Sequence, residues 1–260
     1  MYIGIDIGST NAKIACIDKN EDIKILKIMS TGFNSKLTAK KLLTEVEEKI
    51  NTDDNIIVAT GYGRVSVDEA NKTVTEISCH AKGACKIFGK DNLVIIDIGG
   101  QDTKIIDVEN KIVKDFIMND KCSAGTGRFL DVMSKTMELN IEEMCEIAEF
   151  GGGVKISSLC TVFAESEVIS LIGKSEKKEN IANAIVMSIV NKVATQTKKI
   201  DYKNKNVCLT GGLSEMIFIK NALGDVLNAD VLVDKNGKFA GSIGAALFAK
   251  EFEVKNEKFT

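Results

Sequence analysis

Two phrases of the sequence place an aspartate, a glycine turn and a lysine in the same order. The first runs from Asp6 to Lys13 and the second from Asp97 to Lys104. Each follows an apolar stretch that predicts a buried strand, and its glycines let backbone N–H groups approach an oxyanion without an intervening Cβ. An aspartate beside such a turn can hold a divalent cation directly or through water. Two such turns facing each other across a cleft would bind a nucleoside triphosphate from both sides.

Either phrase alone is a weak signal, because strands often end in Asp and Gly simply to make a turn. The repetition favours a phosphate site. Two later phrases, Gly211-Gly212 after a buried strand and Gly241 to Gly244 at a helix start, are by themselves typical of turns and would together line an adenine and ribose slot. The Asp phrases lead into strands, which argues against a Rossmann domain, and the full P-loop phrase is absent.

Two of the seven cysteines lie in loops of small or polar residues that precede helices. Cys122 stands in the phrase Lys-Cys-Ser-Ala-Gly-Thr-Gly. Cys160 precedes a helix that we predict over residues 164–172, with Glu165 and Glu167 in its first turn, where the helix dipole favours acidic side chains. Free N–H groups and the positive end of a helix dipole favour a thiolate or an anionic cluster at both cysteines.

Cys16 and Cys208 lie in strand patterns and Cys145 lies on an apolar helix face, which predicts that these three are core residues. Cys79 and Cys85 point apart on one predicted helix, which disfavours a ligand role there without excluding it. An iron–sulfur or zinc site takes four ligands. A two-fold dimer, in which each chain contributes Cys122 and Cys160, supplies them economically. The residues alone leave open whether this pair binds metal or is merely small residues at tight helix entries.

The elements that must position these residues repeat as well. Three strands are predicted in the first part of the chain and three in the second, each set followed by helices: residues 2–7, 12–18 and 23–29, then 92–97, 102–108 and 111–117. The sequence therefore predicts a duplicated α/β unit, with two lobes and a nucleotide cleft between them. The N-terminal lobe comprises residues 1–90, completed by a C-terminal helix at about 240–252, and the C-terminal lobe comprises residues 91–239.

The composition is that of an ordinary globular protein, with 260 residues, 44% hydrophobic and 27% charged. A net charge of −3 predicts no general nucleic-acid surface. No apolar stretch is long enough to span a membrane, and no signal region precedes the first strand. We therefore expect a cytoplasmic protein whose partners include neither nucleic acid nor membrane.

The two Asp phrases and the later glycines resemble the actin, sugar-kinase and chaperone-ATPase superfold, over nearly the whole chain. The resemblance implies that Asp6 and Asp97 organise Mg²⁺ and its waters, and that Gln101 lies near the γ-phosphate to orient the attacking water. It also implies a set of residues that bind ATP or ADP: Gly8, Ser9, Thr10, Asn11, Ala12, Lys13, Gly99, Gly100 and Gln101 at the phosphates, and Gly211, Gly212, Gly241 and Gly244 at the adenosine.

Two longer phrases, Asn119 to Met133 and Cys160 to Ser170, resemble the activator ATPases of 2-hydroxyacyl-CoA dehydratases, a family that includes the ATPase subunits of benzoyl-CoA reductases. Thr60 to Arg64 and Ser78 to Ala81 also resemble this family. The resemblance implies a homodimer with one [4Fe–4S] cluster between the subunits, ligated by Cys122 and Cys160 of each chain.

The same resemblance implies ATP-driven transfer of one electron to a dehydratase component, with ferredoxin or flavodoxin as the donor. Ser123 and Leu159 depart from many relatives, which have Ala and Thr, and both are next to a ligand position. Two other classes remain open, a small-molecule kinase of the same superfold and a dimer with structural zinc or a redox-sensing thiol pair. A kinase needs a carboxylate base at the acceptor hydroxyl, and none stands out. For His80, the single histidine, packing or hydrogen bonding near the cleft is favoured over catalysis. The sequence leaves open whether Arg64 contacts the partner subunit or a phosphate.

Overall fold

We describe the protein from a computed structural model that covers residues 1–50, 54–158 and 160–257, without the side chains of residues 255–257. Leu159 lies outside the described residues. The chain forms two compact units. The first contains Met1–Asn92, Val108–Lys114 and Asn236–Thr260, and the second contains Leu93–Asp107 and Asp115–Lys235. Within the described residues, no helix has the length and apolar character that crossing a membrane requires.

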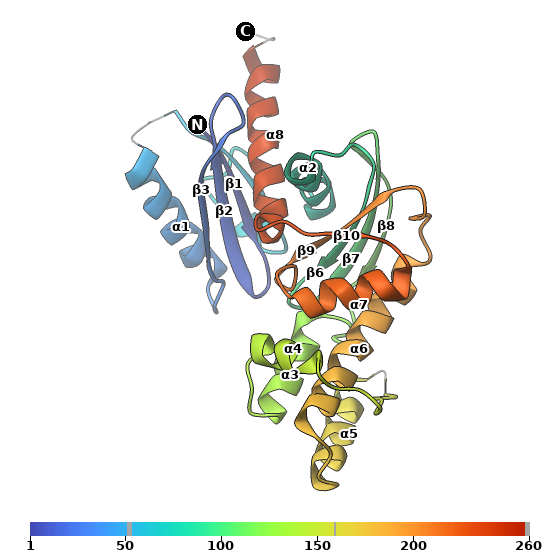
Figure 1. Cartoon of the computed structure of the whole chain (residues 1–260). Coiled ribbons are helices and arrows are strands. Elements are labelled where there is room, and N and C mark those ends of the chain that lie inside the picture. The colour runs from blue at the N-terminus through green and yellow to red at the C-terminus, as the bar shows by residue number, and fades with distance from the viewer. Residues whose placement is uncertain (51–53, 159, 258–260) are drawn as a thin grey trace. The chain divides into compact units, whose positions relative to one another are not determined.

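The first unit is built on a sheet of order β3-β2-β1-β4-β5. Figure 1 labels its strands β1, β2 and β3. Its elements are β1 (Tyr2–Ile7), β2 (Asn11–Ile17), β3 (Ile23–Ser30), α1 (Ser35–Ile50), β4 (Ile56–Thr60), β5 (Lys72–Thr73), α2 (Glu76–Phe88) and the C-terminal α8 (Ala240–Glu257), with short 3-10 turns at Arg64–Ser66 and Gly237–Phe239. Apolar side chains of α1 pack on one face of this sheet, and those of α8 pack on the other.

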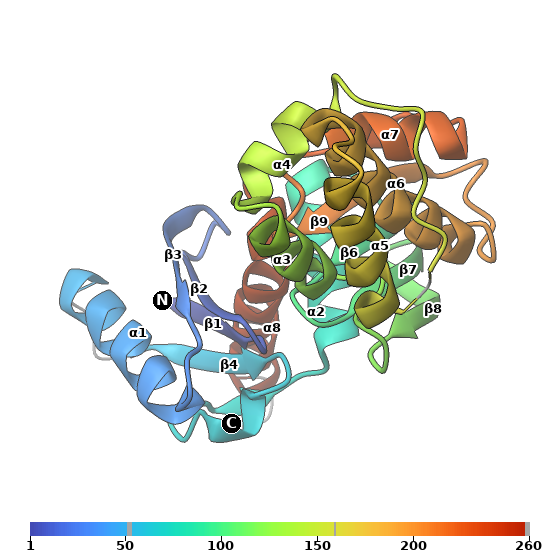
Figure 2. The same cartoon turned by 90° about the horizontal axis from the view of Figure 1, so that it is seen from below.

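The second unit is built on a sheet of order β10-β9-β6-β7-β8. Its elements are β6 (Leu93–Ile98), β7 (Thr103–Glu109), β8 (Ile112–Asn119), α3 (Gly127–Thr136), α4 (Ile141–Ala148), α5 (Thr161–Gly173), α6 (Lys178–Thr197), β9 (Asn206–Gly211), α7 (Ile217–Leu227) and β10 (Val231–Leu232). The end of β7 and the start of β8, within Val108–Lys114, belong to the first unit. Helices α3, α5 and α6 lie side by side (Figure 2). A core of buried residues, including Phe129 and Ile185, joins these helices to the sheet.

The two sheets have the same topology, which confirms the predicted duplicated α/β fold. Reading the second sheet from β8 gives three consecutive strands followed by two crossover strands, as in the first. The crossover strand β4 pairs in parallel with β1, and β9 pairs in parallel with β6. Sequence patterns missed β5, because this strand has only the two residues Lys72–Thr73 and both are exposed.

The start of α5 corrects one prediction. The helix begins at Thr161, with Cys160 as its extended N-cap residue, and its first turn contains no acidic residue. Glu165 and Glu167 therefore lie in the second turn, not in the first. The pattern placed the start too late because Val162 and Phe163 are exposed and do not follow the buried helical period. Helix α3 ends at Thr136, and Glu138 beyond it has a φ of 55°.

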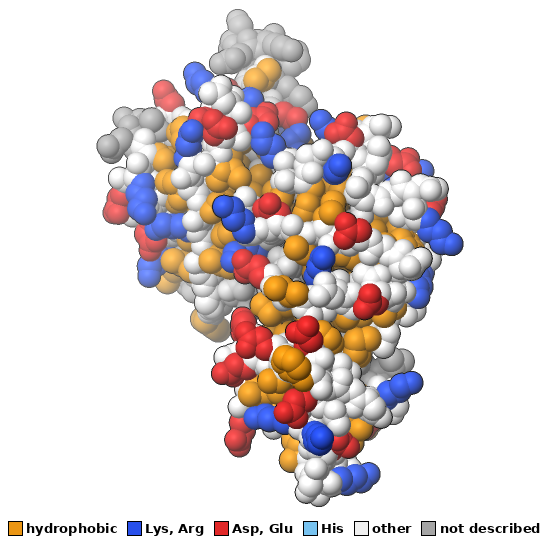
Figure 3. Space-filling view, viewed as in Figure 1, with side chains coloured by type: hydrophobic (Ala, Val, Ile, Leu, Met, Phe, Trp, Pro, Cys, Tyr) orange, Lys and Arg blue, Asp and Glu red, His pale blue; other side chains and the backbone are white. Residues whose placement is uncertain are grey.

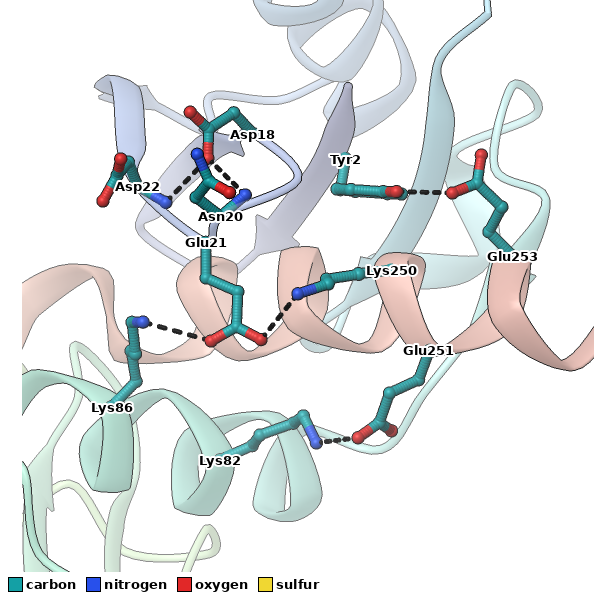
Figure 4. Close-up of polar contacts among 10 residues, drawn as sticks. All are labelled: Tyr2, Asp18, Asn20, Glu21, Asp22, Lys82, Lys86, Lys250, Glu251 and Glu253. Carbon is teal, nitrogen blue, oxygen red and sulfur yellow. Dashed lines mark hydrogen bonds and ion pairs between the residues drawn. The ribbon is translucent and has the colours of Figure 1, made fainter.

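Helix α8 approaches α2 closely, because glycines face each other at the crossing. A Cβ at Gly244 would lie 1.8 Å from the Cys79 carbonyl oxygen, and one at Gly83 would lie 1.9 Å from the Ala240 carbonyl oxygen. Ion pairs and a tyrosine hydroxyl hold the outer turns of α8 (Figure 4). They join Lys250 to Glu21, Lys82 to Glu251 and Tyr2 to Glu253, and Glu21 also accepts from Lys86.

The surface carries interspersed charges. On the face shown in Figure 3, basic and acidic side chains alternate without a continuous basic region. This mixed distribution on the face shown agrees with the small net charge of −3.

Candidate functional site

The two Asp phrases fold into the same turn. In the first unit the Gly8 N–H donates to the Asn11 carbonyl at 3.1 Å, and in the second unit the Gly99 N–H donates to the Asp102 carbonyl at 2.9 Å. A Cβ at Gly8 would lie 2.8 Å from the oxygen that closes its turn, so the turn requires glycine there. The turns expose Ser9, Thr10 and Gln101 to solvent. These side chains are therefore accessible to a ligand.

The other predicted nucleotide residues lie at strand ends or at the start of one helix. Gly8 to Thr10 form the β1–β2 turn, and Gly99 to Gln101 lie between β6 and β7. Strand β2 begins with Asn11, Ala12 and Lys13, of which Ala12 is buried. Gly211 ends β9, Gly212 follows it, and Gly241 and Gly244 lie in the first turns of α8. Gly212 has open space at its Cβ position, unlike Gly244, whose close approach to α2 explains the glycine.

Asp6 and Asp97 are each buried against a glycine at the end of the neighbouring parallel strand. Asp6 is 4% exposed and pairs in register with Thr60, and Asp97 is 2% exposed and pairs with Thr210. The next residues, Gly61 and Gly211, have φ angles of 87° and 86°.

A Cβ at Gly61 would lie 2.4 Å from the Asp6 Oδ1 atom, and one at Gly211 would lie 2.9 Å from the Asp97 Oδ1 atom. Thr60-Gly61 and Thr210-Gly211 are thus counterparts. Sequence reasoning treated them separately, although the shared Thr-Gly at the end of each crossover strand was the signal that could have linked them.

The lysines of the two Asp phrases have different surroundings. Lys104 is 1% exposed, and its Nζ atom lies 2.9 Å from Asp102 Oδ2 and 3.4 Å from Asp97 Oδ2. Asp97 also accepts a hydrogen bond of 3.0 Å from the Thr210 hydroxyl. Lys13, opposite Asp6 in the β1–β2 register, is only half-buried. In the second unit the ammonium of Lys104 therefore compensates the negative charge of two carboxylates and holds both side chains in place.

Exposure divides the cysteines into two classes. Cys122 and Cys160 are exposed, and the other five are buried. Burial raises the pKa of Cys79 and of Cys145 to about 12, and it also raises the pKa of Cys16 and Cys85. The prediction that Cys16, Cys208 and Cys145 belong to the core is confirmed. Thiolates are the ligands of iron–sulfur clusters, and two exposed thiols fit a site that a second chain completes.

Hydrogen bonds hold the loop of Cys122. The Asn119 side-chain amide donates to the carbonyls of Cys122 and Ala124 at 2.9 and 3.0 Å. The Thr126 hydroxyl donates to the Ser123 carbonyl at 2.7 Å. These bonds close the loop on itself and leave the Cys122 thiol at the surface.

The segment before Cys160 is held by one carboxylate of α5. Glu167 accepts hydrogen bonds from the backbone N–H groups and from the hydroxyls of both Ser157 and Ser158. These hydrogen bonds lower the pKa of the Glu167 carboxyl, the Ser158 hydroxyl being the largest cause. The carboxylate thus holds Ser157 and Ser158, shortly before the N-cap cysteine.

The second Asp–Gly turn (Asp97 to Asp102), predicted to bind phosphate, is joined directly to the Cys122 loop. The Thr103 hydroxyl donates to the Gly125 carbonyl at 2.5 Å in a buried hydrogen bond. The backbone N–H groups of Gly127 and Arg128, at the start of α3, donate to the carbonyls of Gly99 and Gly100 at 2.9 and 2.7 Å. A displacement of this turn would therefore move the loop that carries Cys122.

We expect the iron-free native protein to show two fast-reacting thiols per chain towards an aromatic disulfide reagent at about pH 8. A raised pKa lowers the thiolate fraction at a given pH, so Cys79 and Cys145 should stay unreactive until the pH approaches their values of about 12. Denaturant should release all seven thiols. Rapid reaction of more than two thiols in the native protein would contradict the division by exposure.

Two units with the same sheet topology and the same Asp–Gly turns define the actin and sugar-kinase fold. A ROK family glucokinase from Streptomyces griseus shares this fold with a TM-score of 0.60, covering 96% of this chain and 99% of that one, and at 15% identity the likeness shows the fold alone. The chain belongs to the BadF/BadG/BcrA/BcrD ATPase family, which it matches over residues 3–249. Membership of this family makes the chain a nucleotide-binding ATPase, and the buried carboxylates beside its turns are oxygen donors of the kind that Mg²⁺ prefers.

Two members of the family are similar along the whole chain. The activator of lactoyl-CoA dehydratase from Anaerotignum propionicum is 40% identical over 259 residues, which cover 96% of this chain and 98% of that protein. The structure of the activator of the 2-hydroxyisocaproyl-CoA dehydratase from Clostridium difficile with bound ADPNP matches with a TM-score of 0.92 and 38% identity, covering 100% of this chain and 98% of that one.

Proposed function

We propose that the protein is the ATP-dependent one-electron activator of a 2-hydroxyacyl-CoA dehydratase. The observation that carries the proposal is the pair of exposed cysteines, each at the entry to a helix, of which Cys122 is hydrogen-bonded through its loop to the second phosphate turn. Both relatives named above are activators of such dehydratases. An ATPase whose nucleotide turn is joined to a thiol loop is suited to couple hydrolysis to electron transfer.

The metal site in this proposal is one [4Fe–4S] cluster per homodimer, held by Cys122 and Cys160 of each chain. The exposed apolar side chains of α5 support the second copy, because Val162 and Phe163 are each 66% exposed and Ile169 is 56% exposed. These three lie on the helix that Cys160 caps. A two-fold contact over this helix would cover them and bring each ligand to the shared site twice.

The nucleotide residues have separate proposed tasks. Asp6 and Asp97 organise Mg²⁺ and its waters, and Gln101 orients the attacking water at the γ-phosphate. Ser9 and Thr10 bind phosphate oxygens, together with the other turn residues Gly8, Asn11, Ala12, Lys13, Gly99 and Gly100. Gly211, Gly212, Gly241 and Gly244 lie along the adenosine. The exposure of Ser9, Thr10 and Gln101 supports these assignments.

The cluster supplies reversible one-electron transfer. The chain's own residues supply the link to the nucleotide, since the Gly99–Gly100 turn, Thr103 and the start of α3 form one hydrogen-bonded group with the Cys122 loop. The nucleotide can shift this hydrogen-bonded group only if it binds one conformation of the group more tightly than another. The electron donor is ferredoxin or flavodoxin and the acceptor is the dehydratase component, all in the cytoplasm.

Anaerobic purification tests the proposal. We expect a brown homodimer with about four irons per dimer, and ATP hydrolysis that needs no acceptor hydroxyl. ADP formation that depends on an added sugar or acid would instead show a small-molecule kinase. Zinc without ATPase activity would show a structural or thiol-sensing dimer. Reduction of benzoyl-CoA by the co-purifying partner would place the chain with the benzoyl-CoA reductase ATPase subunits.

The Thr103→Val variant tests the link between the nucleotide turn and the cysteine loop. In the wild-type protein we expect ATP to change the rate at which a chelator removes iron. Loss of the Thr103–Gly125 hydrogen bond, worth about 1 kcal/mol, should reduce this ATP effect severalfold. Thr195→Val is the matched control, because the Thr195 hydroxyl only bonds within its own helix. An undiminished ATP effect in Thr103→Val would refute the link.

A further inference from the structure

A hydroxyl pair joins the two segments that carry the exposed cysteines. The Ser123 Oγ atom lies 2.7 Å from the Thr161 Oγ1 atom, and either hydroxyl can be the donor. Ser123 directly follows Cys122, and Thr161 directly follows Cys160. Both residues belong to the second unit, and both are half-buried. The contact therefore ties one cysteine segment to the other within a single protomer.

Each segment is already ordered on its own side of this contact. Asn119 and Thr126 close the Cys122 loop, and Glu167 holds the residues before Cys160. Those bonds fix the shape of each segment but not the distance between them. The Ser123–Thr161 bond spans the two segments, and because its hydroxyls directly follow the cysteines, it limits how far the two cysteine backbones can move apart.

We infer that Ser123 and Thr161 are positioning residues that set the separation of the Cys122 and Cys160 thiols, so that each protomer presents a preorganised pair of ligands. The inference rests on the proposed function, because it assigns the pair of thiols to one shared cluster. A preorganised pair lowers the ordering cost of assembling the site, since two segments per protomer are held before the metal binds. Without the tie, each segment would have to be ordered separately by the cluster.

The experiment compares the rate of iron release to a chelator, without oxygen or nucleotide, in Ser123→Ala, Thr161→Val and the double variant. Changes in residues that hold metal ligands typically weaken metal binding 10–100-fold, so each single variant should release iron about tenfold faster. The double variant should be no faster than the single ones, because both remove the same hydrogen bond. Thr161→Ser keeps the hydroxyl, so this variant should release iron at the wild-type rate.

Ser166→Ala is the matched control on the same helix. The Ser166 hydroxyl is exposed and donates to the Val162 carbonyl, so its loss should leave iron release unchanged. Hydrogen exchange of the iron-free protein gives an independent measurement. Backbone amides of residues 120–127 and 160–165 should exchange faster in Ser123→Ala and Thr161→Val than in Ser166→Ala.

Wild-type iron release and exchange in Ser123→Ala and Thr161→Val would overturn the inference, and so would additive effects in the double variant. Failure of the proposed function has a different result. Iron retained by Cys122→Ala would remove the cluster assignment itself, and with it the role of the hydroxyl pair. If the cysteine variants lose iron but the hydroxyl variants hold it normally, the positioning role of Ser123 and Thr161 is wrong and the cluster assignment stands.

Discussion

Cys122→Ala and Cys160→Ala are each expected to abolish iron binding, with loss of the brown colour and of electron transfer to the dehydratase. The shared site takes two thiolates from each protomer, so either substitution removes two of four ligands from the dimer. Replacement ligands are scarce, because the other five cysteines are buried and burial raises the pKa of Cys79 and Cys145 to about 12. Iron content per dimer after anaerobic purification is the measurement.

Cys208→Ala is the control for this prediction. Cys208 is fully buried in β9, so its variant loses one sulfur atom without touching either exposed cysteine segment. We expect the full iron content and near-normal ATP hydrolysis. ATP binding should also survive in Cys122→Ala, because its nucleotide turn is intact. A normal cluster in Cys122→Ala or Cys160→Ala would defeat the ligand assignment.

Lys104→Met is expected to cause the largest loss of stability among single substitutions in the second phosphate turn. The Lys104 ammonium is buried and lies within 3.4 Å of Asp97 and 2.9 Å of Asp102. Removing one partner of a buried ion pair leaves uncompensated charge and costs about 3–5 kcal/mol. That cost corresponds to a fall in melting temperature of roughly 6–20 °C for a chain of this size. The melting temperature of the nucleotide-free protein is the measurement.

Lys135→Met is the matched control, because its ion pair with Asp131 is exposed. The Lys135 side chain is 70% exposed, and a surface ion pair contributes about 0–1 kcal/mol. Asp102→Asn combined with Lys104→Met should recover part of the lost stability, since it removes one of the two carboxylates that the lysine compensated. A Lys104→Met protein that melts like Lys135→Met would show that these carboxylates need no compensation.

Much of the fold follows from local sequence patterns. Alternating and continuous apolar runs predicted the six strands that open the two halves, and the Asp–Gly phrases marked the turns that follow β1 and β6. Helix ends were less predictable. The start of α5 was placed too late, because Val162 and Phe163 face solvent and interrupt the pattern of buried residues.

The chemistry of the site was open to sequence reasoning only where it depends on neighbours in the chain. Small or polar residues before a helix marked Cys122 and Cys160, and strand or helix patterns marked Cys16, Cys145 and Cys208 as core. Exposure then separated the two groups as expected. These features are local, because the spacing of apolar residues and the start of a helix can be read from a few residues on either side of each cysteine.

The sequence by itself thus determined the duplicated fold, the aspartate turns and the two candidate ligand cysteines. Only the tertiary structure decided which distant residues meet. It set Thr60 beside Asp6 and Thr210 beside Asp97, buried Lys104 between two carboxylates and joined Ser123 to Thr161. The reason is physical. Turn geometry and hydrophobic period are properties of adjacent residues, whereas a hydrogen bond between loops exists only after strand pairing and helix packing have brought those loops together.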